Sequence, residues 1–204
     1  MSLHTPILER LRTETAPIHR QLEALPLSLV LMSPSIRLEE YAAYLAATYG
    51  LLDYIETRFF SITSEFVPDA EERKRAAFIV RDLESIGHLP ANLAAKKSEE
   101  PFLSYFQYPL SETLPYALGV MYVTEGSTLG GRVILKNLSG CLDLNAAAGA
   151  SYFAGYGDST GLKWKTFLQA LNTYAEGNRE TEVIVKGAVD AFHAFYHVLS
   201  FKQP

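Results

Sequence analysis

The sequence predicts an all-α protein, with residues 1–204 forming a single multi-helix bundle domain. Apolar residues recur at three- and four-residue steps in about six long segments, the periodicity of helices that bury one face. No sustained alternation of apolar and polar residues, which would indicate strands, interrupts these segments. The 204 residues are 48% hydrophobic and 20% charged, a composition that suits one sizeable core.

The first two predicted helices cover residues 5–24 and 36–61. Pro17 lies inside the apolar stripe of the first one, so we expect that helix either to kink or to restart just before His19. The second has the clearest amphipathic pattern in the chain, because its charged residues fall outside the apolar stripe. The proline-containing segment between them is predicted to be a connection.

Four further helices are expected. The third is predicted over residues 68–86, because Pro68 suits a first helical position and acidic residues follow it, while Gly87 suits the end. A glycine-rich helix is predicted over 115–138, and the small residues of 139–157 favour a connector. The last two helices are expected over 160–176 and 180–201.

The glycine-rich helix is the most unusual segment of the chain. It contains Gly119, Gly126, Gly130 and Gly131, and each glycine costs about 1 kcal/mol relative to alanine inside a helix. Gly126 and Gly130 are four residues apart and therefore share one helix face. That face would suit either a flat ligand laid against bare backbone or a neighbouring helix packed closely. Spacing alone favours the neighbouring helix.

Composition excludes several classes of function. The 18 basic and 23 acidic residues give a net charge of −5, which argues against a nucleic-acid surface, and no basic run indicates an anionic membrane patch. Cys141 is the single cysteine, which excludes an intrachain disulfide and paired-cysteine metal sites. The sequence shows neither a signal peptide nor an apolar run of membrane-spanning length, so we expect a cytoplasmic protein.

Two groups of histidines are candidates for chemistry. His19 precedes Glu23 by four residues, so the imidazole and the carboxylate share a helix face, as a ligating histidine and the carboxylate that orients it would. This spacing is also common among ordinary surface pairs. Asp190, His193 and His197 form half of a carboxylate-bridged di-metal pattern. Its other half would have to come from Glu56, Glu125, Glu14 or Glu23, and no complete E-x-x-H motif is present.

Three segments, taken in order, resemble heme oxygenases, especially the bacterial branch that produces biliverdin. They are LRTETAPIHRQLE at 11–23, YVTEGSTLGG at 122–131 and YFAGYGDSTGLKWKTFL at 152–168. The resemblance implies an all-α fold in which heme lies between the first, proximal helix and the glycine-rich, distal helix. It also implies that heme is both cofactor and substrate, and that its ring is opened to biliverdin with release of ferrous iron and carbon monoxide.

The resemblance also implies roles for individual residues. His19 would ligate the heme iron and Glu23 would orient its imidazole. Gly126 and Gly130 would form the distal wall that steers oxygen onto a ring carbon. By position Arg12, Tyr122 and Lys165 match residues that hold the heme propionates; Lys165 is the weakest match, because the arginine of mammalian members one turn later is Gln169 here.

One departure from the mammalian pattern concerns catalysis. Mammalian members carry an aspartate after the first distal glycine, and this chain has Ser127 there, as bacterial members commonly do. The resemblance implies an external electron donor, such as a ferredoxin or a reductase, since no nicotinamide or flavin motif is present. A photoreceptor that accepts biliverdin is a further expected partner. Two alternatives stay open: a protein that sequesters heme without turnover, and a non-heme di-iron oxygenase.

Overall fold

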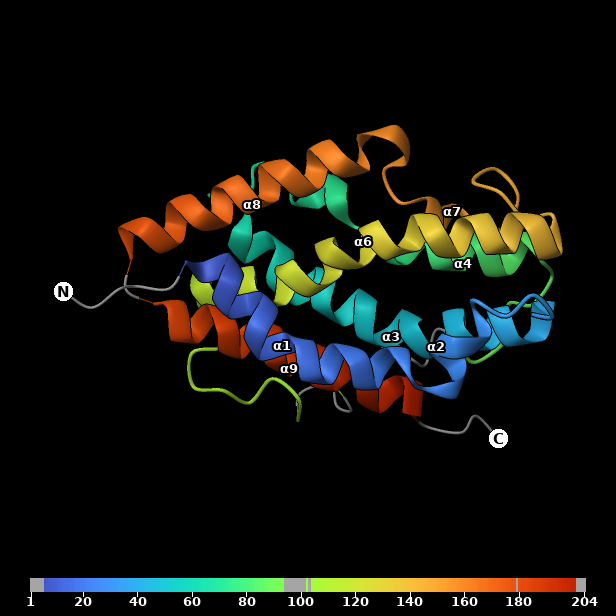
Figure 1. The fold of residues 1–204 in the computed structure, drawn as a ribbon, viewed down its shortest axis with the longest axis horizontal. Coiled ribbons are helices and arrows are strands. Elements are labelled where there is room, and N and C mark those ends of the chain that lie inside the picture. Colours follow the sequence, from blue (N-terminus) through green and yellow to red (C-terminus); the bar gives the residue numbers. More distant parts are fainter. Residues whose placement is uncertain (1–5, 94–101, 103, 179, 201–204) are drawn as a thin grey trace.

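The computed structural model describes residues 6–93, 102, 104–178 and 180–200. Helices dominate this part of the chain, which contains isolated β-bridges around Asn145 but no β-strand, so the all-α prediction is confirmed (Figure 1). The elements are α1 (Ile7–Glu23), α2 (Pro26–Val30), α3 (Leu38–Thr63), η1 (Glu71–Arg73), α4 (Ala76–Ser85), α6 (Leu114–Leu142), α7 (Ser151–Ala154), η3 (Gly157–Ser159), α8 (Thr160–Gly177) and α9 (Thr181–Ser200).

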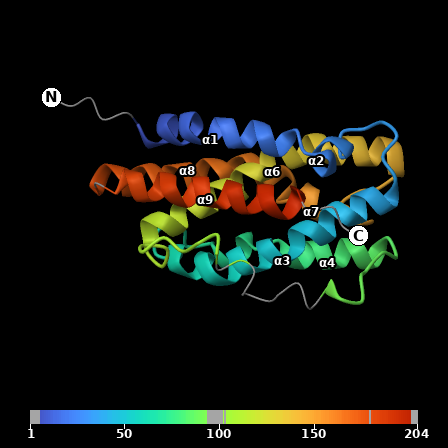
Figure 2. The same ribbon diagram turned by 90° about the horizontal axis from the view of Figure 1, so that it is seen from below.

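The hydrophobic core has two parts that share the long helices α3 and α6. One part joins α1, α8 and α9 to the C-terminal half of α3 and the N-terminal half of α6. The other joins α4 and α7 to the opposite halves of these two helices. Helix α9 packs between α1 and α3 (Figure 2). None of the helices in the described part of the chain combines the length and apolar character that a membrane crossing requires.

The predicted helices differ from the observed ones mainly at their ends. Helix α1 is continuous from Ile7 to Glu23, with Pro17 inside it and exposed, so a restart at His19 is not observed. The segment predicted as a connection contains the short helix α2. The predicted outer ends of the first and last helices, at Thr5 and Phe201, lie outside the described residues.

The predicted start of the third helix at Pro68 is wrong, because α4 begins only at Ala76. The preceding turn η1 and the extended Lys74 bring Arg73 and Arg75 into the interior, where their side chains are 1% and 3% exposed. The buried carboxylate of Glu56 then accepts hydrogen bonds from the backbone N–H groups of Arg75 and Ala76, at 2.6 and 2.9 Å. These bonds satisfy donors at the start of α4 that an isolated helix leaves unpaired.

The predicted end of the glycine-rich helix at Leu138 is also wrong, because α6 continues to Leu142. Leu138 is fully buried in the core that α6 shares with α4 and α7, which favours one more helical turn. Asp143 then ends the helix in the left-handed conformation, with φ at 55°, as a C-terminal residue with a short polar side chain can.

Candidate functional site

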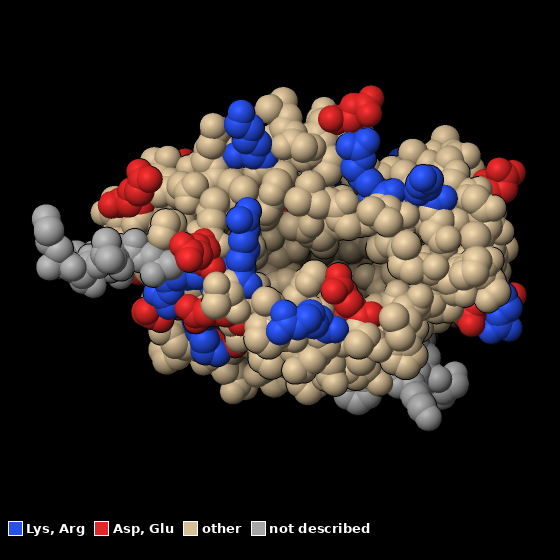
Figure 3. Space-filling model, viewed as in Figure 1, with Lys and Arg blue, Asp and Glu red and all other residues tan. Residues whose placement is uncertain are grey.

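A cavity of about 850 Å³ lies between α1, α2, α6 and α9. Figure 3 shows it as a hollow in the face of the molecule between α1 and α6, with charged residues around its rim. The lining is predominantly apolar and includes Leu29, Met32, Leu129 and Val133, whose side chains are 42% to 59% exposed. Large apolar side chains gathered around a cavity of this size are typical of a small-molecule site.

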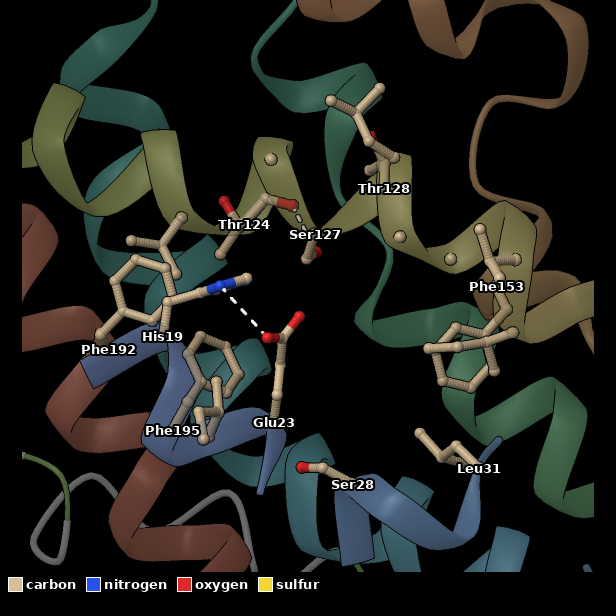
Figure 4. A pocket seen from close by; sticks show the side chains of 18 of the residues that line it. His19, Glu23, Ser28, Leu31, Thr124, Ser127, Thr128, Phe153, Phe192 and Phe195 are labelled. Carbon is tan, nitrogen blue, oxygen red and sulfur yellow. Dashed lines mark hydrogen bonds and ion pairs between the residues drawn. The ribbon is translucent and has the colours of Figure 1, made fainter. Parts of the chain in front are cut away.

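Helix α1 supplies one wall of this cavity. Its buried face, which includes Leu11 and Ile18, packs into the core, and His19 and Glu23 lie on the neighbouring face, which borders the cavity. The His19 ring extends from α1 toward α6 (Figure 4) and packs edge-on against Phe192 of α9, with ring centroids 5.4 Å apart. Nδ1 of His19 lies 3.7 Å from Oε2 of Glu23, so the predicted pairing is present as a long ion-pair contact.

Helix α6 supplies the opposite wall, and Gly119 differs from Gly126 and Gly130 in what an added side chain would meet. A Cβ atom built on Gly119 would lie 1.9 Å from the carbonyl oxygen of Ile184, so this glycine allows α9 to pack directly on the α6 backbone. A Cβ atom on Gly130 would meet no described atom within 4 Å, and one on Gly126 would meet Trp164 at an ordinary 3.6 Å. The packing explanation therefore applies to Gly119 but not to Gly126 or Gly130, both of which line the cavity.

The α6 wall also carries polar groups beside the glycines. The Ser127 hydroxyl donates a hydrogen bond to the carbonyl oxygen of Thr124 at 2.7 Å and accepts one from the Arg75 guanidinium at 3.2 Å. Arg75 also donates to the Thr124 carbonyl at 2.6 Å. Its Nε atom is buried and has no hydrogen-bond partner among the described residues, although Arg75 lines the cavity. A buried guanidinium with an unused donor is suited to bind an oxygen atom of a ligand or of water.

Sequence reasoning missed Arg75. Its only local signal is the Arg-Lys-Arg run at residues 73–75, which looks like the exposed turn of a helix. The structure instead holds its guanidinium over the Tyr152 ring at 5.3 Å and its backbone on Glu56. Burial raises the pKa of Glu56 to about 7, while the bonds from the Arg75 and Ala76 backbone oppose that shift.

Of the three expected anion-binding residues, two line the cavity. Arg12 lies two turns before His19 on α1, and Tyr122 lies one turn before Gly126 on α6. Burial raises the pKa of the Tyr122 hydroxyl, and the positive charge of Arg12 acts in the opposite direction. Lys165 is exposed on α8 and is not among the lining residues, although its neighbour Trp164 is.

The di-metal hypothesis is wrong for the described residues, in which no three His, Cys, Asp or Glu side chains gather to hold a metal ion. Asp190 accepts a hydrogen bond from the Tyr116 hydroxyl at 2.7 Å and pairs with Lys186. His193 and His197 are exposed on α9. The four carboxylates expected to complete the site have other partners. Glu56 accepts backbone hydrogen bonds and Glu125 forms an ion pair with Arg73, while Glu14 pairs with Arg10 and Glu23 with His19.

Taken together, the fold and the cavity define a helical protein that places an imidazole opposite bare glycine backbone, with apolar side chains around both. This arrangement suits a flat apolar ligand that offers an atom for the imidazole to bind.

The chain belongs to the heme oxygenase family: the family model "Heme oxygenase" matches residues 5–200. Heme oxygenase PigA of Pseudomonas aeruginosa is 28% identical over 192 residues, which cover 94% of this chain and 90% of the relative.

Solved structures of heme oxygenases share the fold. That from Leptospira interrogans has a TM-score of 0.78 at 19% identity and covers 96% of this chain and 99% of its own. The heme oxygenase from Neisseria meningitidis, described in NO-bound and CO-bound structures, has a TM-score of 0.74 at 23% identity and covers 95% of this chain and 90% of its own. Heme oxygenase-1 from the cyanobacterium Synechocystis, in complex with heme, has a TM-score of 0.70 at 18% identity, with coverages of 96% and 91%.

Proposed function

We propose that this protein is a heme oxygenase that opens the ring of heme to give biliverdin, ferrous iron and carbon monoxide, using oxygen and externally supplied electrons. One observation carries the proposal: the His19 imidazole on α1 extends toward the stretch of α6 that carries Thr124 and Ser127 (Figure 4), and Gly126 and Gly130 of this stretch line the same apolar cavity. The residues fit heme, because imidazole is a common ligand of heme iron and apolar walls can enclose the faces of the macrocycle.

In this proposal α1 holds the heme iron. His19 binds it through Nε2, and Glu23 lies on the Nδ1 side of the ring. A carboxylate in that position favours the tautomer that is protonated on Nδ1, which leaves the Nε2 lone pair for the metal, and it also orients the ring.

The α6 wall controls the other face of the heme. Gly130 would let backbone approach the macrocycle where a larger side chain would enter open space in the cavity, and Gly126 would do so beside the Trp164 ring. When bound, heme supplies the iron that activates oxygen and the ring carbon that is oxidised. On this side we propose that the unused Nε donor of Arg75 holds water or oxygen by a hydrogen bond. The Ser127 hydroxyl donates to the Thr124 carbonyl and helps to position the Arg75 guanidinium, from which it accepts a hydrogen bond.

The propionates of heme are proposed to lie at the Arg12 and Tyr122 end of the cavity. Arg12 offers a positive charge and Tyr122 a hydroxyl donor, which together suit a carboxylate. Lys165 remains a proposed third contact, because its side chain is exposed on α8, the helix that also supplies Trp164 to the lining.

The electrons are proposed to come from a separate protein in the cytoplasm, such as a ferredoxin or a reductase, because the sequence contains no nicotinamide or flavin motif. A biliverdin-accepting photoreceptor is the proposed destination of the product.

Titration of the purified protein with hemin tests the first half of this proposal. We expect the absorption band of histidine-ligated heme, and we expect His19→Ala to lose or alter it. His193→Ala is the matched control, because His193 is exposed on α9 and does not line the cavity. An unchanged spectrum in His19→Ala would refute the ligand assignment.

Turnover tests the second half. Loaded protein supplied with oxygen and a reductant should yield biliverdin, identified by chromatography, together with carbon monoxide. A heme-sequestering protein is the second candidate, and one observation favours it. The α6 wall has Ser127 where mammalian members carry an aspartate, and the one carboxylate that lines the described part of the cavity is Glu23 of α1. Heme that stays intact through many reducing equivalents would establish sequestration instead.

A further inference from the structure

A buried ion pair lies close to the cavity but does not line it. The Arg73 and Glu125 side chains are each 1% exposed, and Nη1 of Arg73 lies 2.5 Å from Oε2 of Glu125. The Tyr156 hydroxyl donates a hydrogen bond to the other carboxylate oxygen of Glu125 at 2.6 Å. Both carboxylate oxygens of Glu125 are therefore engaged inside the protein.

Arg73 connects three parts of the fold through one guanidinium. Besides Glu125 on α6, it donates to Asp69, ahead of η1, at 2.8 Å. It also donates to two groups of α8, the carbonyl oxygen of Lys163 at 3.0 Å and the Thr166 hydroxyl at 3.1 Å. The rigid fork of an arginine can make such contacts together, whereas the single ammonium group of lysine cannot reproduce them.

The ion pair joins α6 and α8 next to residues of both helices that line the cavity. Glu125 directly precedes Gly126 on α6, and Lys163 directly precedes Trp164 on α8. Both Gly126 and Trp164 line the cavity, and a Cβ atom built on Gly126 would lie 3.6 Å from the Trp164 ring. The same ring packs against Tyr122 of α6, with ring centroids 5.6 Å apart.

We propose that Arg73 and Glu125 are positioning residues, whose ion pair sets the separation between the α6 backbone at Gly126 and Trp164 of α8. Burying two charges is costly, and such a pair often adds little net stability relative to well-packed neutral residues. The pair instead fixes geometry: the Arg73 guanidinium bonds groups of both α6 and α8, so it fixes the position of α8 along the axis of α6. The expected effect on heme rests on the proposed function, whereas the effect on Trp164 does not.

Trp164 provides a direct test, because it is the single tryptophan of the chain. In the heme-free protein, Glu125→Gln keeps the side-chain shape and an acceptor for Tyr156 but removes the charge. We expect acrylamide quenching of Trp164 fluorescence to increase at least twofold and the hemin dissociation constant to rise about tenfold. Glu182→Gln is the matched control. It removes the same charge from a different ion pair, the exposed one with Arg10, and should change neither the Trp164 quenching nor the hemin dissociation constant.

The double variant Arg73→Met with Glu125→Gln separates positioning from stabilisation. It leaves neither charge buried without a partner, so we expect it to fold with a urea midpoint near that of the wild type even if Glu125→Gln alone does not fold. Increased Trp164 quenching in this folded variant supports positioning. Unchanged quenching, with helical content preserved by circular dichroism, overturns it. If wild-type protein does not bind hemin, the proposed function fails, and the Trp164 measurement alone decides the positioning role.

Discussion

Replacing single glycines of α6 with alanine distinguishes a glycine that is needed for helix packing from one that leaves room for a ligand. The two test positions are Gly119, which faces α9, and Gly130, which faces the cavity. Alanine is favoured over glycine inside a helix by about 1 kcal/mol, and that gain applies equally at both positions. The positions differ in what the added methyl group meets.

At Gly130 the methyl group meets no described atom within 4 Å, so Gly130→Ala should stabilise the heme-free protein by about 1 kcal/mol. At Gly119 it would lie 1.9 Å from the Ile184 carbonyl oxygen and 2.9 Å from the Ala188 nitrogen. These are backbone atoms, so α6 and α9 must move apart. The cost of such overpacking outweighs the helix gain and leaves a net loss of about 2 kcal/mol.

Thermal unfolding measures the difference. For a chain of this size, 1 kcal/mol shifts Tm by roughly 2–4 °C, so Gly130→Ala should melt a few degrees above the wild type and Gly119→Ala clearly below it. In the proposed function, Gly130→Val also weakens hemin binding by about tenfold or more, because its side chain occupies ligand space. Equal Tm values for the two alanine variants would refute the packing assignment, and unchanged hemin affinity in Gly130→Val would refute the distal-wall assignment.

Three further predictions concern charged groups. Because the pKa of Glu56 is about 7 in the folded protein, against an ordinary value of 4.5 for a glutamate in water, the folded protein holds a proton here that the unfolded chain loses between these values. The contribution of Glu56 to stability should therefore fall by about 3 kcal/mol as pH rises through that window and stay constant above it. Urea midpoints from pH 4 to 8 should show that Glu56→Gln loses this dependence; an unchanged slope would contradict the assignment. Arg12→Gln should weaken hemin binding roughly fivefold, whereas Arg20→Gln, outside the cavity lining, should not. The Arg12 effect should disappear with the dimethyl ester of hemin, and its persistence would rule out a propionate contact. Asp190→Asn should cost about 2 kcal/mol in urea unfolding, because it weakens a buried bond from Tyr116, yet leave hemin affinity unchanged; altered affinity would give Asp190 a part in the site.

Helical periodicity was sufficient to predict the fold class and most of the helices, because an apolar stripe is a local property of the sequence. The start of α4 was not predictable in the same way. Acidic residues after Pro68 look like a first helical turn, but Glu56, distant in sequence, accepts the backbone N–H groups that make Ala76 the actual start. Side chains that pair across the fold leave no trace in a local pattern.

In the candidate site, too, local patterns were predictable and contacts across the fold were not. The four-residue spacing of His19 and Glu23 made them a candidate pair, and the two side chains do lie together on the cavity. Spacing could not distinguish Gly119 from Gly130, since the difference depends on whether Ile184 or open space lies opposite. Arg75 was missed because its burial depends on partners on α6, which is distant in the sequence.

The position of the cavity has a consequence for the dynamics of the heme-free protein. Helix α1 packs extensively on α9, but its side toward α6 borders the cavity. Helix α2 contains no buried residue. Because few buried contacts hold α2 and one side of α1 borders the cavity, amides in α1 and α2 should exchange with solvent faster than those of α6. A ligand present at a hundredfold excess over its Kd adds about 2.7 kcal/mol of stability, and the slowing of exchange should be concentrated in these two helices. In this sense the ligand completes the hydrophobic interior of the protein that is proposed to consume it.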